Sequence, residues 1–318
     1  MQTYRANRRT SRSNASLVAL LLAFTVLLGA LPATPAATVS AAAEKPTITV
    51  GSKNLTEQYI LGHIVAELLE AHGYPVVRRM GLGGNSVIFP AVQRGDIDVY
   101  PEYAGTAYLV HLGRELEIPM NIDDIFETIV REFDERFDLE FMPGMGFNNT
   151  YVFVTTREMA ARHNLQKVSD LIPIASRYAL GGSIDFMSDR PDGVRGVERV
   201  YGMRFGRNRP MDSSLLFRAL QLGQVDFIVA FSTHGQIAAM DLVTLEDDRH
   251  VFPPYHVSLV ARKDLFEKDP EVREVLMKLH NAMDEATMAR LNYRVDGNHE
   301  EPRDVARSWL LEKGLISE

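Results

Sequence analysis

The pattern of apolar and polar positions from Thr47 onward predicts strands that alternate with helices. The run "TITVGSKN" is typical of a strand entering a turn, and apolar side chains then recur at helical spacing through "TEQYILGHIVAELLEAHG". Asn54, with Glu57 three residues later, predicts the start of this helix, and Gly73 predicts its end. A strand in "PVVRRMGL", a short helix in "GNSVIFPAVQRG" and a strand in "DIDVY" follow. This βαβαβ order indicates a parallel α/β sheet.

An internal repeat predicts a second lobe of similar build. Residues 86–99, "SVIFPAVQRGDIDV", and residues 214–227, "SLLFRALQLGQVDF", are identical at six of fourteen positions with a constant offset of 128. Most of the other positions exchange one aliphatic residue for another. We therefore expect two α/β lobes, with two chain crossings that form a hinge and a ligand cleft between the lobes.

The repeat also places two aromatic residues at equivalent positions. The strand "DIDVY" continues into "PEYAGT", and the offset carries Tyr103 of this segment onto Phe231 of "VAFSTHG". Loops at the carboxyl ends of parallel strands line the crevice of such sheets, so each lobe is expected to present an aromatic ring to a ligand. The alternative for each ring, taken singly, is that it packs beneath its own turn.

The first 43 residues have the order of a secretory signal peptide. A segment with four arginines and no acid precedes an apolar run from Ala15 to Leu31, and the small residues of "PATPAATVSAAAE" follow. A transmembrane anchor is the alternative, but the apolar run is short for a membrane span. Because the chain has no cysteine to carry a lipid anchor, we expect a cleaved protein that is free in the periplasm.

Charge and composition exclude several classes of function. The formal net charge of the 318 residues is −8, and removal of the arginine-bearing first segment leaves a still more acidic chain, which is a poor candidate for binding nucleic acid. The absence of cysteine excludes thiolate chemistry, and the sequence has neither a Gly-x-Ser-x-Gly elbow nor a phosphate-binding glycine loop. The nine histidines are scattered. We therefore expect no catalytic residue, no metal site and no cofactor.

Five segments together resemble a known family. The segments "GSKNLTEQYILG", "GDIDVYPEYAGT", "NNTYVFVT", "DRPDG" and "FSTHG…LEDDRHVFPPY" are similar, in order and spacing, to the osmoprotectant (glycine betaine/choline/carnitine) substrate-binding proteins of ABC transporters. The similarity extends from Thr47 to the C-terminus. It implies a two-lobed periplasmic-binding-protein fold and a small quaternary-ammonium ligand. It also implies two partners, an ABC permease in the inner membrane and a separate ATPase subunit.

The resemblance further implies the residues that contact the ligand. A quaternary ammonium cannot donate hydrogen bonds, whereas aromatic faces attract it by roughly 0.5–2 kcal/mol each. A charged hydrogen bond to a carboxylate tail contributes roughly 1.5–3 kcal/mol, and the planar fork of an arginine can meet such a tail at two points. Matched segment by segment, the aromatic cage comprises Tyr103, Tyr151, Phe231 and Tyr255, and the carboxylate contacts are Lys53, Thr106 and Arg190.

Two residues depart from the family pattern, which more often has tyrosine and aspartate where this chain has "FSTHG". Phe231 keeps an aromatic face but lacks a hydroxyl group, and His234 brings a titratable group near the cleft. His234 is either a hinge or surface histidine, or a ligand-site residue that shifts ligand preference or makes binding vary between about pH 6 and 8. Lys53 and Arg190 have the alternative of being solvated surface charges. Glu102 either orients Lys53 or caps a helix.

The predicted domains are a signal peptide (1–43), lobe I (44–144 plus 245–318) and lobe II (145–244). We expect a monomer that serves as the binding component of an importer for a quaternary-ammonium osmoprotectant such as glycine betaine. Choline, carnitine and other trimethylated amino acids stay open as ligands. Two other functions stay open on the same fold: a sensory ligand-binding module, and an enzyme, which would need a reactive group in the cleft.

Overall fold

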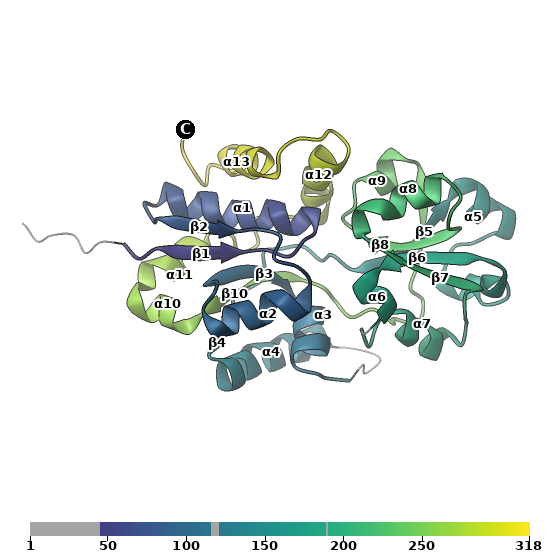
Figure 1. Cartoon of the computed structure of the whole chain (residues 1–318), viewed down its shortest axis with the longest axis horizontal. Helices are drawn as coiled ribbons and strands as arrows, with labels where there is room; N and C mark the ends of the chain where they lie inside the picture. The colour runs from purple at the N-terminus through teal and green to yellow at the C-terminus, as the bar shows by residue number, and fades with distance from the viewer. Residues whose placement is uncertain (1–44, 116–120, 189) are drawn as a thin grey trace, which may run out of the picture. The chain divides into compact units, whose positions relative to one another are not determined.

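The computed structural model describes residues 45–115, 121–188 and 190–318, and the predicted signal peptide lies outside the described residues. These residues form two separate five-stranded sheets, each flanked by helices (Figure 1). The predicted two-lobed α/β fold is therefore confirmed. In the described part of the chain, no helix has both the length and the apolar character needed to cross a membrane.

The first sheet has the strand order β2-β1-β3-β10-β4. The strands β1, β2 and β3 are parallel, as the βαβαβ pattern predicts, whereas β10 runs antiparallel to both β3 and β4. Helix α1 covers one face of the sheet, with α12 and α13 packed on its outer side, and α2 and α4 cover the other face (Figure 1). The bounds of the strands are β1 (Ile48–Gly51), β2 (Val76–Arg79), β3 (Val99–Tyr103), β4 (Leu139–Phe141) and β10 (Val257–Arg262). Those of the helices are α1 (Thr56–Ala71), α2 (Asn85–Arg94), α3 (Ala104–Thr106), α4 (Ile122–Phe137), α10 (Lys263–Lys268), α11 (Pro270–Met277), α12 (Glu285–Asp296) and α13 (Pro302–Glu312).

The second sheet has the strand order β7-β6-β8-β5-β9 and repeats the pattern of the first. Its strands β6, β7 and β8 are parallel, and β5 runs antiparallel to β8 and β9. The bounds of the strands are β5 (Tyr151–Thr156), β6 (Ala179–Ser183), β7 (Arg207–Met211), β8 (Phe227–Phe231) and β9 (Leu242–Leu245). Those of the helices are α5 (Arg157–His163), α6 (Ile184–Ser188), α7 (Val194–Tyr201), α8 (Leu216–Gln221) and α9 (Gln236–Ala239).

A glycine and an aspartate that are identical in the two repeat segments have the same structural role in both sheets. Gly95 and Gly223 follow α2 and α8 with φ values of 77° and 65°, a left-handed conformation that glycine adopts without steric cost. The side chain of Asp98 accepts a hydrogen bond from the backbone N–H of Thr49 in β1 over 2.7 Å, and that of Asp226 accepts one from Ala179 in β6 over 2.8 Å. Each aspartate therefore ties the strand after the repeat helix to the first strand of its sheet.

The chain passes from the first sheet to the second between β4 and β5 and returns between β9 and β10. The two crossing segments lie side by side, because Asn148 and His256 form an antiparallel bridge. The N–H of Asn149 also donates to the carbonyl of Tyr255 over 3.1 Å. Two crossings match the predicted hinge, and they bring Tyr151 and Tyr255 next to each other. The predicted lobe boundaries at residues 144 and 244 stay predictions.

Helix α1 shows where the sequence pattern misled. The helix begins at Thr56, the first residue of the predicted helical run, but its N-cap is Leu55 and no side chain caps it, so the start signal predicted at Asn54 and Glu57 was wrong. Glu57 instead points into the protein interior, where it is 5% exposed. The predicted end holds more closely, since α1 ends at Ala71 and Gly73 follows with a φ of 81°.

Candidate ligand-binding site

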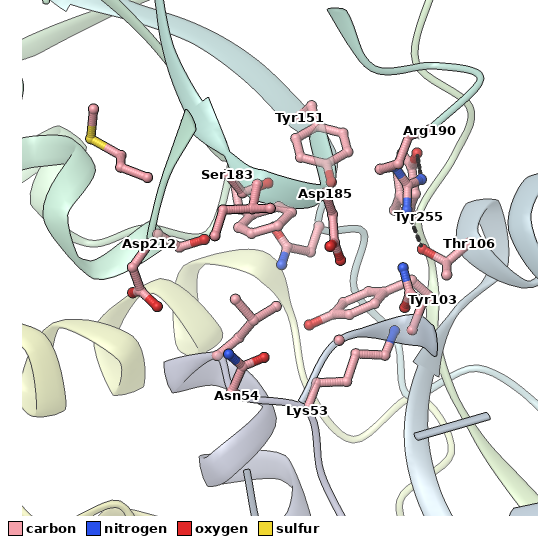
Figure 2. Close-up of a pocket in the computed structure, with 18 residues that line it drawn as sticks. Lys53, Asn54, Tyr103, Thr106, Tyr151, Ser183, Asp185, Arg190, Asp212 and Tyr255 are labelled. Carbon is pink, nitrogen blue, oxygen red and sulfur yellow. Dashed lines mark hydrogen bonds between the residues drawn. The ribbon is translucent and has the colours of Figure 1, made fainter. Parts of the chain in front are cut away.

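A cavity lined by residues from both sheets contains seven of the eight predicted site residues. They are Lys53, Tyr103, Thr106, Tyr151, Arg190, Phe231 and Tyr255 (Figure 2). The same cavity is also lined by residues that were not predicted as site residues, among them Asn54, Asn85, Asn149, Ser183, Asp185 and Asp212. Residues far apart in the chain therefore meet at one place.

The four aromatic residues come from strand ends and from a crossing segment. Tyr103 is the last residue of β3, and Phe231 is the last residue of β8, which are equivalent strands of the two sheets. Tyr151 begins β5 and pairs in register with Phe231, so their rings stack with centroids 4.9 Å apart at an angle of 28°. Tyr255 meets Tyr151 edge-on, with centroids 5.5 Å apart at 84°. The ring positions thus follow from strand register and from the pairing of the crossings.

Arg190 joins elements of the two sheets. Its guanidinium donates one hydrogen bond to the hydroxyl of Thr106 over 3.2 Å and one to the hydroxyl of Tyr255 over 2.5 Å (Figure 2). The guanidinium donates two more to Asp192, over 3.0 and 3.2 Å. It also lies 5.4 Å from the ring centroid of Tyr151. Burial alone would lower the pKa of Arg190, but the neighbouring groups, Tyr151 and Asp192 first among them, raise it above its ordinary value. The arginine is therefore a fixed positive charge.

Lys53 is the second buried cation of the cavity. Its ammonium donates to Glu102 over 2.5 Å and lies 5.2 Å from the ring centroid of Tyr103. Glu102 also accepts from the hydroxyl of Tyr100 over 3.0 Å and lies 2.8 Å from Nε2 of His111. Burial alone would raise the pKa of Glu102, but Lys53 and His111 outweigh it and lower the pKa to about 2. Of the two roles predicted for Glu102, the structure therefore supports the orientation of Lys53.

A comparison with protein families identifies the family of this chain. Residues 46–312 match the model of the substrate binding domain of the ABC-type glycine betaine transport system. The chain belongs to this family. It is a substrate-binding component of a glycine betaine/carnitine-type ABC transporter.

Three individual proteins are similar to this chain over most of its length. The chain is 36% identical over 86% of its length to the ergothioneine transport permease/ergothioneine binding protein of Helicobacter pylori, and it spans about half (48%) of that protein. It is 32% identical to the carnitine transport binding protein of Listeria monocytogenes over 84% of this chain and 86% of that protein. A crystal structure of a glycine betaine/carnitine/choline ABC transporter shares 32% identity, with a TM-score of 0.70 over 85% of this chain and all of that one. All three are named as parts of transport systems.

The structure of this glycine betaine family member also contains a buried carboxylate that sequence analysis missed. Oε1 of Glu57 accepts from the hydroxyl of Tyr103 over 2.9 Å and from Nδ2 of Asn149 over 2.8 Å. Its Oε2 accepts from the hydroxyl of Thr233 over 2.6 Å and from Nδ2 of Asn292 over 3.1 Å. A signal was present, because position 57 falls on the same helical stripe as the apolar residues 60, 61 and 64. An acid on an apolar stripe indicates a buried, hydrogen-bonded charge.

His234 is the predicted site residue that does not line this cavity. It lines a neighbouring cavity, and its ring stacks on that of Phe231, with centroids 5.5 Å apart, and meets Phe217 at 5.1 Å. Its Nδ1 accepts a hydrogen bond from the backbone N–H of Phe231 over 3.0 Å. Burial lowers the pKa of His234, which favours the neutral ring. The histidine thus supports the outer side of Phe231, and its effect on ligand preference stays a prediction.

Proposed function

We propose that this protein binds a small zwitterion that carries a trimethylammonium group and a carboxylate, with glycine betaine as the representative ligand, and delivers it to an ABC permease. The observation that carries the proposal is that four aromatic rings and two buried cations line one cavity. The rings are Tyr103, Tyr151, Phe231 and Tyr255, and the cations are Lys53 and Arg190. We further propose that the protein acts as a monomer after export to the periplasm, and that a separate ATPase subunit powers the permease.

The rings suit the ammonium end of such a ligand. A trimethylammonium group has no N–H to donate, so it gains more from the negative faces of aromatic rings than from hydrogen-bond acceptors. Because Tyr151 and Phe231 stack at 4.9 Å, no group fits between them, and this pair forms one wall. Tyr103 and Tyr255 contribute the other walls. Three walls of roughly 0.5–2 kcal/mol each give roughly 1.5–6 kcal/mol, less than the roughly 8 kcal/mol of a micromolar complex.

The cations suit the carboxylate end. Four of the five N–H groups of Arg190 have partners among the residues that the structure describes, and we assign the fifth to a ligand. The ammonium of Lys53 has three N–H groups, of which one meets Glu102. The hydroxyl of Thr106 accepts from Arg190 and keeps its own hydrogen free to donate. Hydrogen bonds from charged donors contribute roughly 1.5–3 kcal/mol each, which supplies the rest of the affinity.

The charge balance favours a zwitterion over an ion. Lys53 pairs with Glu102, and Arg190 pairs with Asp192, so each buried cation already has an anionic partner. Two further carboxylates of the cavity, Asp185 and Asp212, can face the ammonium end of a ligand. The remaining N–H groups of Arg190 and Lys53 can meet its carboxylate end, so a ligand with both charges finds a partner at each end. Two relatives are named for ergothioneine and carnitine, which are also trimethylammonium carboxylates. They are therefore the first alternatives to glycine betaine.

The test is calorimetric titration of the protein from Glu44 onward with glycine betaine, carnitine, ergothioneine and choline. We expect saturable binding of at least one carboxylate ligand and weaker binding of choline, which has a hydroxyl in place of the carboxylate. Tyr103→Ala should weaken binding at least tenfold, about 1.4 kcal/mol. The matched control is Tyr178→Ala, because Tyr178 packs against His163 outside the cavity. If all four compounds give no heat of binding, or if both variants lose affinity equally, the proposed function is wrong.

A further inference from the structure

Glu57 connects parts of the protein that are far apart in the chain. Its donors lie on β3 (Tyr103), in the crossing segment (Asn149), in the turn after β8 (Thr233) and on α12 (Asn292). Thr233 is 176 residues away from Glu57 in sequence and Asn292 is 235 residues away. The carboxylate thus sits where the first sheet, the crossing and the second sheet meet.

The hydrogen bonds indicate that Glu57 is ionised. The amide of Asn292 donates twice, to Glu57 and to the carbonyl of Thr233 over 3.0 Å, so the orientation of this amide is fixed. The amide of Asn149 also has its nitrogen toward Glu57, over 2.8 Å. Each oxygen of Glu57 accepts two hydrogen bonds, which matches a carboxylate that only accepts. Burial raises the pKa of Glu57, and the four hydrogen bonds to the charged form oppose that rise.

We propose that Glu57 is the positioning residue of the cation site: it fixes the Tyr103 ring, ties the turn after Phe231 to the first sheet, and places a negative charge behind the ring that faces the ammonium. This inference rests on the proposed function, because it requires an ammonium group at Tyr103. Glu57 lines the neighbouring cavity, which shares Tyr103 with the ligand cavity, so in this proposal it acts on the ligand through Tyr103.

Two physical effects follow from this arrangement. A phenol that donates to a carboxylate shifts electron density toward its ring, which makes the ring face more negative and strengthens its attraction for a cation. In addition, Thr233 lies two residues after Phe231, so the same carboxylate fixes a ring of each sheet. Both effects favour a cation over an uncharged group of the same shape.

The experiment compares glycine betaine with 3,3-dimethylbutyrate, in which a carbon replaces the ammonium nitrogen. The ratio of the two affinities reports the charge selectivity of the site, because shape and carboxylate are the same. We expect Glu57→Gln to lower this ratio about tenfold, the scale of one cation–π contact. Tyr103→Phe, which keeps the ring but loses the hydrogen bond to Glu57, should lower it in the same direction.

The matched control is Glu67→Gln, on the same helix. Glu67 is also buried (2% exposed), but it pairs with Arg78, Arg303 and Arg307 and lies outside the cavity. This variant should lose stability without changing the ratio. A purely structural role of Glu57 would weaken both probes equally, and an unchanged ratio in Glu57→Gln overturns the inference. If Glu57→Gln does not fold, an unchanged ratio in Tyr103→Phe overturns it instead. If the wild type binds neither probe, the proposed function fails, and this inference fails with it.

Discussion

Replacement of Arg190 by lysine should separate the carboxylate contact from the ammonium contact. Arg190 is 6% exposed, and its planar group reaches Asp192, Thr106 and Tyr255 at once. Lysine keeps the positive charge, so Asp192 retains a cationic neighbour. However, the lysine ammonium is a single point of charge and cannot hold two partners and a ligand carboxylate in one plane. The variant therefore tests geometry, with the charge preserved.

The expected magnitude follows from the contacts. The proposed carboxylate ligand loses one hydrogen bond to a charged donor, which contributes roughly 1.5–3 kcal/mol. That loss corresponds to an increase in Kd of about 10- to 150-fold. Choline has no carboxylate, so its Kd should rise much less. The only expected contribution is a weaker contact with the Tyr255 ring, which loses its hydrogen bond from Arg190. The ratio of the two changes measures the carboxylate contact.

The assay is calorimetric titration of the wild type, Arg190→Lys and Arg195→Lys with glycine betaine and choline. Arg195 is an exposed arginine near the start of α7, and its replacement should leave both affinities unchanged. Thermal unfolding of each variant checks that the fold persists. Equal losses for the two ligands in Arg190→Lys would refute the assignment of Arg190 to the carboxylate, and so would no loss for glycine betaine.

Three further predictions concern residues around the rings. Gly105→Ala should weaken glycine betaine binding at least tenfold in calorimetry, because the added Cβ would lie 2.6 Å from the Tyr255 ring and displace it; unchanged affinity would contradict that ring's role. The pKa of Glu102 is about 2 against an ordinary 4.5, so its contribution to stability, about 3 kcal/mol, should be complete above pH 4.5 and lost as the pH falls toward 2. Urea unfolding should show this loss in the wild type and not in Glu102→Gln. Because burial lowers the pKa of His234, its ring should stay neutral, and the affinity for glycine betaine should be constant between about pH 6.5 and 8. A change in affinity over this range that disappears in His234→Gln would contradict the prediction.

The parallel strands of the first sheet and the equivalent positions of Tyr103 and Phe231 were predictable. Alternating periodicities gave the parallel strands of the first sheet, and the repeat at an offset of 128 gave the equivalent helix and strand of the second. These features depend on neighbours within a few residues, because helix and strand periods, glycine turns such as Gly95, and aspartates such as Asp98 are local signals. The antiparallel strands β5 and β10 were not predicted, because their pairing depends on segments distant in the chain.

The sequence by itself determined which residue types stand at the ends of the strands, and with the family resemblance it named seven residues that line the cavity. Only the tertiary structure decided how their charges are used. Arg190 donates a hydrogen bond to Thr106, which lies 84 residues away in the sequence. Glu57, which the sequence predicted to mark a helix start, is a buried carboxylate that accepts hydrogen bonds from Tyr103 of the first sheet and from Thr233 after β8 of the second. A local pattern is set by side chains a few positions apart. The partner of a buried charge depends on which elements pack together in the tertiary structure. The spacing of residues along the chain does not predict those contacts.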